Sequence, residues 1–236
     1  MTSIAETAPI THAPSSLPSA FDLILRGQRD LDVLLQDERN HSPIIRKLLT
    51  VAILGLAAQG MTVGLTMQFF GADRISFYAD VVRGPIVLWM PFAFLAAFLG
   101  ALSICLPSFY FYTQLSGLDA SFRLVTAQAL RTQATTSVFL FGVLPIYLAV
   151  ALTSVVTKEI APAAVVLVGF ASPFLVGLTG VRALYRGFRH MLSYVEITHE
   201  RCGAFLLRML VAWSAVYTAI APVALYRAVT ALAQLF

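Results

Sequence analysis

The chain has 236 residues, of which 58% are hydrophobic and only 12% are charged. Soluble domains carry roughly 25% charged residues, and the mean hydropathy here is +0.81, so the composition predicts a membrane protein. The net charge of +4 does not indicate nucleic-acid binding, because no basic and aromatic cluster lies outside the apolar stretches.

The first 42 residues are predicted to lie outside the membrane. Residues 1–18 are rich in Pro, Ser, Thr and Ala and lack the regions of a signal peptide, so we expect a disordered cytoplasmic tail. Residues 19–42 show the spacing of an amphipathic cytoplasmic helix. Its apolar face holds Phe21, Ile24, Leu25, Leu31, Leu34 and Leu35.

Two interpretations of this amphipathic helix stay open. Its pattern favours a helix packed beneath its own bundle. The alternative is a docking site for a partner, formed by Phe21, Ile24 and Leu31. Attachment to anionic lipid is disfavoured, because the segment carries three arginines against five carboxylates and interfacial helices favour Lys and Arg.

Residues 43–236 are predicted to form an all-α transmembrane bundle. Five apolar stretches have about the ~20 residues that a helix needs to cross a bilayer. They lie at about 48–70, 85–106, 134–156, 161–181 and 204–226. Only the short sequence TKEI joins the third and fourth stretches, which therefore form a tight antiparallel hairpin.

A connector between the second and third spans is predicted to be an interfacial helix. Beyond Gly117, apolar residues alternate with polar ones at helical spacing. Leu118, Phe122, Val125 and Leu130 are expected to face the membrane, and Arg123, Gln128 and Arg131 to face water.

The first span carries the clearest helix-packing signal. Gly60 and Gly64 are four residues apart, with Gly55 close to the same face, and glycines at this spacing let a second helix approach closely. Gln59 and Gln68 are the strongly polar side chains of this span, and we expect both to face the bundle interior. An amide there serves either as a hydrogen bond between helices, which we favour, or as part of a transport path.

The placement of basic residues predicts the orientation. With five spans and a cytoplasmic N-terminus, nine arginines and lysines lie near the inner side and four near the outer side. The positive-inside rule then places the N-terminus in the cytoplasm and the C-terminus outside. Arginine outnumbers lysine fourteen to two, which suggests a bacterial source and so an inner-membrane location.

No catalytic, cofactor or metal site is predicted. Glu196, His199 and Glu200 form a single E-x-x-H pattern, whereas bundle metal sites need two copies and further carboxylates. Cys105 and Cys202 give neither a disulfide framework nor metal-ligand spacing. No phosphate-binding loop or nucleophile motif is present.

Residues 80–146 resemble the Ypt-interacting-protein (Yip) family of small five-span membrane proteins. The residues that carry the resemblance are Asp80, Gly84-Pro85, Ser121-Phe122, Ala129-Leu130 and Leu144-Pro145. The chain departs from the family at Val81-Val82-Arg83, where a shorter uncharged step is expected. The resemblance implies a non-enzymatic membrane scaffold or adaptor; eukaryotic relatives bind small GTPases in vesicle traffic.

Together these patterns predict a non-enzymatic scaffold or accessory subunit that acts through protein contacts in the membrane. The alternative is a channel or transporter component whose pathway forms within an oligomer. The expected partners are the lipid bilayer and other membrane proteins or a second copy, with no small-molecule substrate. The expected contact residues are Gly60, Gly64, Gln59, Phe21, Ile24 and Leu31.

Overall fold

The computed structural model describes most of the chain. It covers residues 37–70, 85–118, 120–157, 161–194 and 200–235, with positions 21–22, 24–25, 31 and 34–35 before them. The side chains of 191–194, 200–203 and 206 lie outside this description. The expected tail at 1–18 and the E-x-x-H side chains at 196–200 therefore fall outside the described part.

The predicted all-α bundle of five spans is confirmed. A short 3-10 helix, η1 (Glu38–Asn40), leads into the first of five long helices, each long and apolar enough to cross a membrane. These helices are α3 (His41–Phe70), α4 (Ile86–Leu115), α5 (Phe122–Thr157), α6 (Pro162–Tyr194) and α7 (Glu200–Leu235). Each extends past the apolar stretch that marked it in the sequence.

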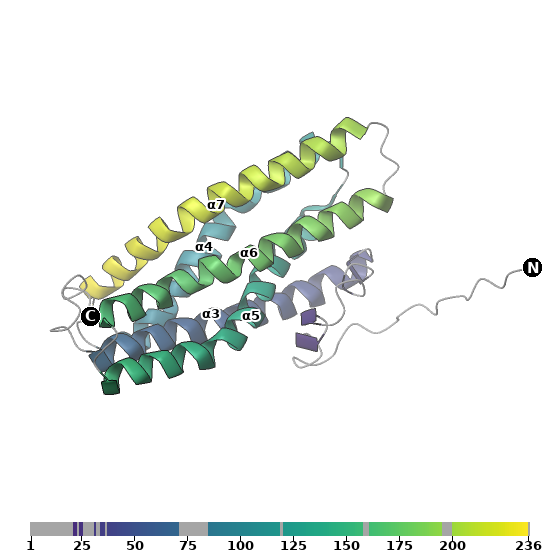
Figure 1. The fold of residues 1–236 in the computed structure, drawn as a ribbon. Coiled ribbons are helices and arrows are strands. Elements are labelled where there is room, and N and C mark those ends of the chain that lie inside the picture. The colour runs from purple at the N-terminus through teal and green to yellow at the C-terminus, as the bar shows by residue number, and fades with distance from the viewer. Residues whose placement is uncertain are drawn as a thin grey trace, which may run out of the picture.

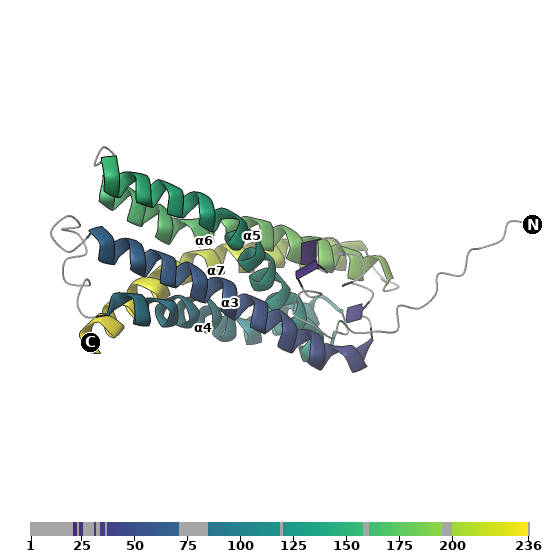
Figure 2. The same ribbon diagram turned by 90° about the horizontal axis from the view of Figure 1, so that it is seen from below.

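Helix α3 is the central element of the bundle. It packs between α4 and α5, and the view from below shows it lying between them (Figure 2). Helix α6 packs mainly on α5, and α7 mainly on α4. Helices α6 and α7 contact each other less, so they form a seam at which the ring of helices is least tightly closed (Figure 1).

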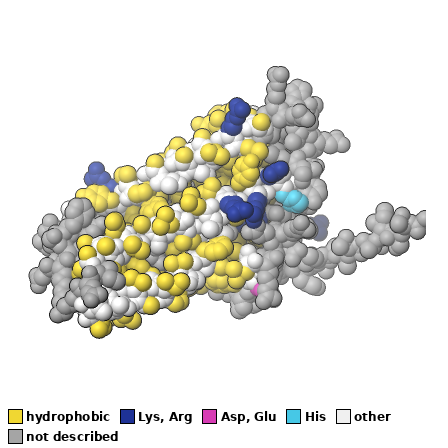
Figure 3. Space-filling model, viewed as in Figure 1, with side chains coloured by type: hydrophobic (Ala, Val, Ile, Leu, Met, Phe, Trp, Pro, Cys, Tyr) yellow, Lys and Arg dark blue, Asp and Glu magenta, His cyan; other side chains and the backbone are white. Residues whose placement is uncertain are grey.

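One end of the bundle is basic. It contains the starts of α3, α5 and α7 and the ends of α4 and α6, and we call it the basic end. The described Lys and Arg side chains gather there, whereas Arg227 stands near the opposite, far end (Figure 3). At 1.5 Å per residue the 36 residues of α5 extend for roughly 54 Å, well beyond the ~30 Å hydrocarbon core.

The connector predicted beyond Gly117 is not a separate helix. Helix α5 runs without a break from Phe122, and only Gly117, with φ of +76°, and the turn around it separate α5 from α4. Gln128 and Arg131, expected to face water, are each 1% exposed. The physical reason is enclosure: Gly187 of α6 lies against both side chains, so α6 covers the face that the pattern assigned to solvent.

The described positions of the N-terminal segment pack against the bundle. Ile24, Leu31, Leu34 and Leu35 are buried in a core cluster with residues of α3, α4 and α5. The ring of Phe21 meets that of Phe141 edge-on, with centroids 5.8 Å apart. Leu25 is 61% exposed, so it does not share their buried face. These contacts match the interpretation of a helix packed beneath its own bundle.

Glycines set the closest approaches of α3 to its neighbours. A Cβ atom added at Gly60 would lie 2.7 Å from the Cα of Pro91, and one at Gly64 would lie 3.1 Å from the carbonyl oxygen of Ile86. The groove that these two glycines form is therefore filled by the backbone of α4. Gly55 faces the other way, because a Cβ there would overlap the side chain of Ser137 on α5.

We predict that Gly60→Ala destabilises the protein, whereas Gly100→Ala does not. At Gly60 the added methyl meets backbone that cannot rotate away, and overpacking of this kind costs about 1–3 kcal/mol. At Gly100 an added Cβ has no atom within 4 Å, so the gain in helix propensity of about 1 kcal/mol remains. Thermal unfolding of both variants in the same detergent measures the difference; equal melting temperatures would contradict the close α3–α4 contact.

Candidate functional site

The expected contact residues lie where segments of this chain pack against one another. Gly60 and Gly64 meet α4, and Gln59 is 2% exposed and turned toward α6. Ile24 and Leu31 are buried in the core, with Phe21 beside them. The described contacts of these residues lie within this chain, which fits the helix-packing role predicted for them.

Gln59 completes a hydrogen bond that a proline removes. Pro173 lacks the N–H that would bond the carbonyl of Gly169 one turn earlier in α6. The Nε2 of Gln59 donates to that carbonyl at 2.9 Å and to the Oγ of Ser172 at 2.8 Å. The Oγ of Ser172 donates to the same carbonyl at 2.9 Å. Because no water is available in hydrocarbon, this hydroxyl and the amide of Gln59 together replace the missing N–H, and the amide also fastens α6 to α3.

Gln68, which we expected in the interior, is exposed on the bundle surface. It lies in the last turn of α3, two residues before the helix ends at Phe70. At a helix end a flexible amide side chain can reach the polar interface. The two glutamines of α3 therefore differ in their surroundings: Gln59 is buried, and Gln68 is exposed.

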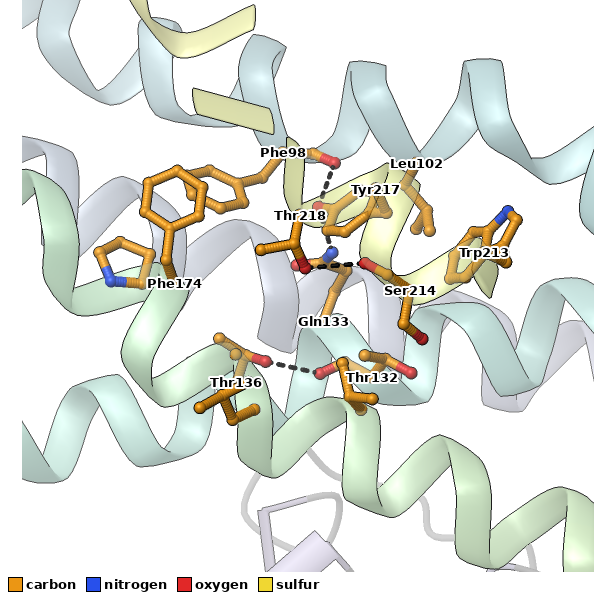
Figure 4. A pocket seen from close by; sticks show the side chains of 14 residues that line it. Phe98, Leu102, Thr132, Gln133, Thr136, Phe174, Trp213, Ser214, Tyr217 and Thr218 are labelled. Atoms are coloured by element: carbon orange, nitrogen blue, oxygen red, sulfur yellow. Dashed lines mark hydrogen bonds between the residues drawn. The ribbon is translucent and has the colours of Figure 1, made fainter. Parts of the chain in front are cut away.

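A cavity lies at the seam between α6 and α7, and we call it the seam cavity. About 40 Å³ of it is available to the centres of water molecules; a single water needs about 10–15 Å³ by this measure. Figure 4 shows its lining seen from close by. The residues come from α4, α5, α6 and α7, and the polar ones are Thr132, Gln133, Thr136, Ser214, Tyr217 and Thr218.

Tyr217 ties three helices together at one side of the seam cavity. Its hydroxyl donates to the carbonyl of Phe98 on α4 at 3.1 Å and accepts a bond of 2.6 Å from the Nε2 of Gln133 on α5 (Figure 4). Beside it, the Nε1 of Trp213 donates to the carbonyl of Cys105 at 3.1 Å. These bonds hold α7 on α4 and fix one wall of the cavity.

The hydroxyl groups around the cavity differ in their hydrogen bonds. Thr132, Thr136 and Thr218 each donate to a carbonyl four residues earlier in their own helix, at 3.4, 2.9 and 2.7 Å. Their oxygens therefore keep lone pairs that can accept. Ser214 is 7% exposed, and its Oγ makes no hydrogen bond with any residue in the described part of the chain. Ser214 is one of the residues that line the cavity, but its Oγ is itself buried and does not open into it.

An apolar groove continues the seam toward the far end, and we call it the seam groove. About 280 Å³ of the groove is available to the centres of water molecules. The residues that line it are Leu167, Phe170, Ala171, Phe174, Pro222, Leu225, Tyr226 and Val229. Phe174 lines both the cavity and the groove, so the two are adjacent. Both spaces have mainly apolar linings, and most of the polar side chains stand around the cavity.

The seam is lined by uncharged side chains. The residues that line the cavity and the groove include no Asp, Glu, His, Lys or Arg. Among the described residues, no group of three His, Cys, Asp or Glu side chains could hold a metal ion. The seam offers uncharged hydrogen-bond donors and acceptors next to an apolar surface. Sequence analysis missed it, although Thr132 with Thr136 and Ser214 with Thr218 are hydroxyl pairs at a spacing of four.

We predict that Gln59→Leu destabilises the protein by about 1 kcal/mol, within the range of ~0.6 to ~1.7 kcal/mol measured for bonds between membrane helices. In a Pro173→Ala background the new N–H can bond Gly169 within α6, so the same change should cost less. Thermal or denaturant unfolding of the four proteins in the cycle measures this coupling. Gln68→Leu is the matched control and should be neutral. Additive effects of Gln59→Leu and Pro173→Ala would contradict the role of the hydrogen bond from Gln59 to Gly169.

In comparisons with known proteins, no family model, curated protein or solved structure matches the chain. The resemblance of residues 80–146 to the Yip family therefore stays a prediction from those residues. The function of this five-span protein has to be inferred from its geometry.

Proposed function

We propose that this chain is a non-enzymatic scaffold or accessory subunit of a bacterial inner membrane that acts through protein contacts. One observation carries the proposal: buried polar side chains of one helix form hydrogen bonds to another helix and so hold the bundle together. Gln59 fastens α6 to α3, and Gln133 with Tyr217 fastens α7 to α5 and α4. A bundle fastened in this way is a rigid surface for neighbours.

The charges of the spans support the same proposal. In the described parts of α3 to α7 the acidic residue is Glu200, at the very start of α7. Ion-coupled and proton-coupled transporters keep ionisable residues at membrane depth, because a moving charge needs a partner there. Arg131 is buried, but it lies in the first third of α5 at the basic end.

A channel or transporter component is the second candidate, and the seam cavity is the observation that favours it. Six polar side chains converge there from two helices. The cavity admits only a few water molecules, and apolar residues line the seam beyond it. A transport path would therefore require further polar surface from a second subunit.

We predict that the N-terminus is cytoplasmic and the C-terminus periplasmic. The described arginines concentrate at the basic end (Figure 3), and basic residues are retained on the cytoplasmic side. Reporter fusions after Asp119 and Ser193 should give a cytoplasmic signal, and a fusion after Ala72 a periplasmic one. A reversed signal at any of these positions would contradict the orientation.

We predict that a scaffold shows directional contacts with one protein. A photo-crosslinking amino acid placed in living cells at exposed positions on different sides, Ile104 on α4, Leu175 on α6 and Val211 on α7, should give a protein adduct of one defined mass from one side. The buried Met67 is the control position. Adducts to lipid alone, together with ion or solute flux in liposomes of the purified chain, would favour the transport candidate instead.

A further inference from the structure

We propose that three exposed arginines on α6 bind the headgroup of an anionic phospholipid in the leaflet at the basic end. The residues are Arg182, Arg186 and Arg189, and we call them the arginine row. The site lies on the outer surface of the bundle, and it does not depend on the scaffold function. It rests on the grouping of the charges, on their lack of partners, on their depth and on the apolar surface beside them.

The first argument is the grouping. The members of the arginine row are four and three residues apart, and side chains at these spacings are neighbours on a helix, with Cβ atoms about 5–6 Å apart. Dark-blue side chains lie over α6 and α7 toward the basic end (Figure 3). The other described, exposed arginines at this end are Arg46, Arg123 and Arg208, one on each of α3, α5 and α7. Exposed positive charge is therefore concentrated on α6.

The second argument is the lack of partners. Helix α6 contains no acidic residue, and no described residue forms a hydrogen bond or ion pair with the guanidinium groups of the arginine row. Like charges at spacings of three and four destabilise a helix, so an anion that binds the row would stabilise α6. A guanidinium group binds a phosphate through two parallel hydrogen bonds. The row therefore fits a phosphate group.

The third argument is depth, which identifies the source of the phosphate. Residues 162–181 of α6 carry no charge. At 1.5 Å per residue this stretch extends for roughly 30 Å, which is the thickness of the hydrocarbon core. Arg182 therefore lies at its boundary, with Arg186 roughly 6 Å and Arg189 roughly 10 Å beyond. Helical side chains lean toward the N-terminus of their helix, here toward the membrane, so the row reaches the level of lipid headgroups.

The fourth argument is the apolar surface beside the row. On the same face of α6, one to four turns toward the far end, Leu178, Leu175 and Val168 are 64%, 67% and 55% exposed. Tyr185 stands within the row and is 36% exposed, and tyrosine is enriched at membrane interfaces. A phospholipid with its phosphate on the arginines would lay its tail along these apolar side chains. This is the orientation of a lipid in the leaflet at the basic end.

The charge of the row decides which phospholipid binds. A zwitterionic headgroup carries an ammonium group besides its phosphate, and the arginines repel that ammonium group. Helix α6 offers no carboxylate to hold it. A headgroup with a net negative charge, such as that of phosphatidylglycerol, is only attracted. The arginine row therefore selects an anionic phospholipid over a zwitterionic one.

The test uses the full-length protein in mild detergent and a phosphatidylglycerol with a photoactivatable group in its acyl chain. We expect labelling on the α6 peptide that contains Leu175 and Leu178. Unlabelled phosphatidylglycerol should compete about tenfold better than phosphatidylcholine with the same chains, the equivalent of ~1.4 kcal/mol. Free glycerol phosphate should not compete, because it lacks the tail that the apolar face of α6 would hold.

Exposed positions allow variants that leave the core unchanged. Arg182→Gln, Arg186→Gln and Arg189→Gln should each weaken binding about fivefold, the equivalent of the ~1 kcal/mol that one basic residue contributes near an anionic membrane surface. Arg46→Gln removes an exposed arginine of α3 at the same end, and Arg227→Gln removes one near the far end of α7. Both controls should bind the lipid as the wild type does.

Three results would each overturn the proposal. Equal competition by the two phospholipids would leave the arginine row to an acidic protein segment. Displacement by free glycerol phosphate would make the ligand a soluble phosphate. An effect of Arg46→Gln as large as that of the row variants would show that the basic end attracts anions diffusely, without a site on α6.

The outcome is separate from that of the scaffold proposal. The photo-crosslinking positions on α4, α6 and α7 report on protein partners, whereas the labelled phosphatidylglycerol reports on the arginine row. A chain that selects the anionic lipid but gives no protein adduct would retain the lipid site and lose the scaffold function. A chain that gives a protein adduct but does not select the anionic lipid would do the reverse.

Discussion

The close approach of α3 to its neighbours is the constraint on which the rest of the structure depends. Lipid tails are as apolar as leucine, so helices in a bilayer gain little from hydrophobic burial against one another. They associate through close packing and hydrogen bonds. Between Gly55 and Gly64, α3 meets α5 through Gly55, α6 through Gln59 and α4 through Gly60 and Gly64. Three of the other four long helices are thus fixed within three turns of one helix.

Helix α7 lies outside this arrangement, and the seam is the consequence. Its anchors are aromatic: Trp213 stacks on Phe109 with centroids 4.6 Å apart, and Tyr217 stacks on Trp213 at 5.7 Å. Their polar atoms bond backbone carbonyls of α4. In the described part of the chain, α7 contacts α6 less than it contacts α4. The seam cavity and the seam groove lie in the space that remains between α6 and α7.

The fold was largely predictable from the sequence, since long charge-free stretches have few alternatives in a chain of this composition. The spacing of Gly60 and Gly64 also predicted a close contact, but not that α4 would fill it, because spacing carries no information about the partner. The hydrogen bond from Gln59 to Gly169 spans 110 positions, and the sequence around either residue does not predict the other as its partner. Gln128 and Arg131 were predicted to face water because helical periodicity assigns polar residues to solvent unless the surrounding helices are known.

Helix α5 shows why polarity alone could not locate the seam. Residues 127–138 are buried on every side although they include Gln128, Arg131 and Gln133, whereas many of the apolar residues beyond Phe139 are exposed. Burial therefore follows position in the bundle and not side-chain type. Most buried polar groups of this region are explained by a bond within or between helices. The Oγ of Ser214 is buried without a hydrogen-bond partner among the described residues, as are the Nε1 of Trp89 and the hydroxyl of Tyr147 elsewhere in the core. Because such groups occur in several parts of the core, an unpaired polar atom does not by itself mark the seam as a site.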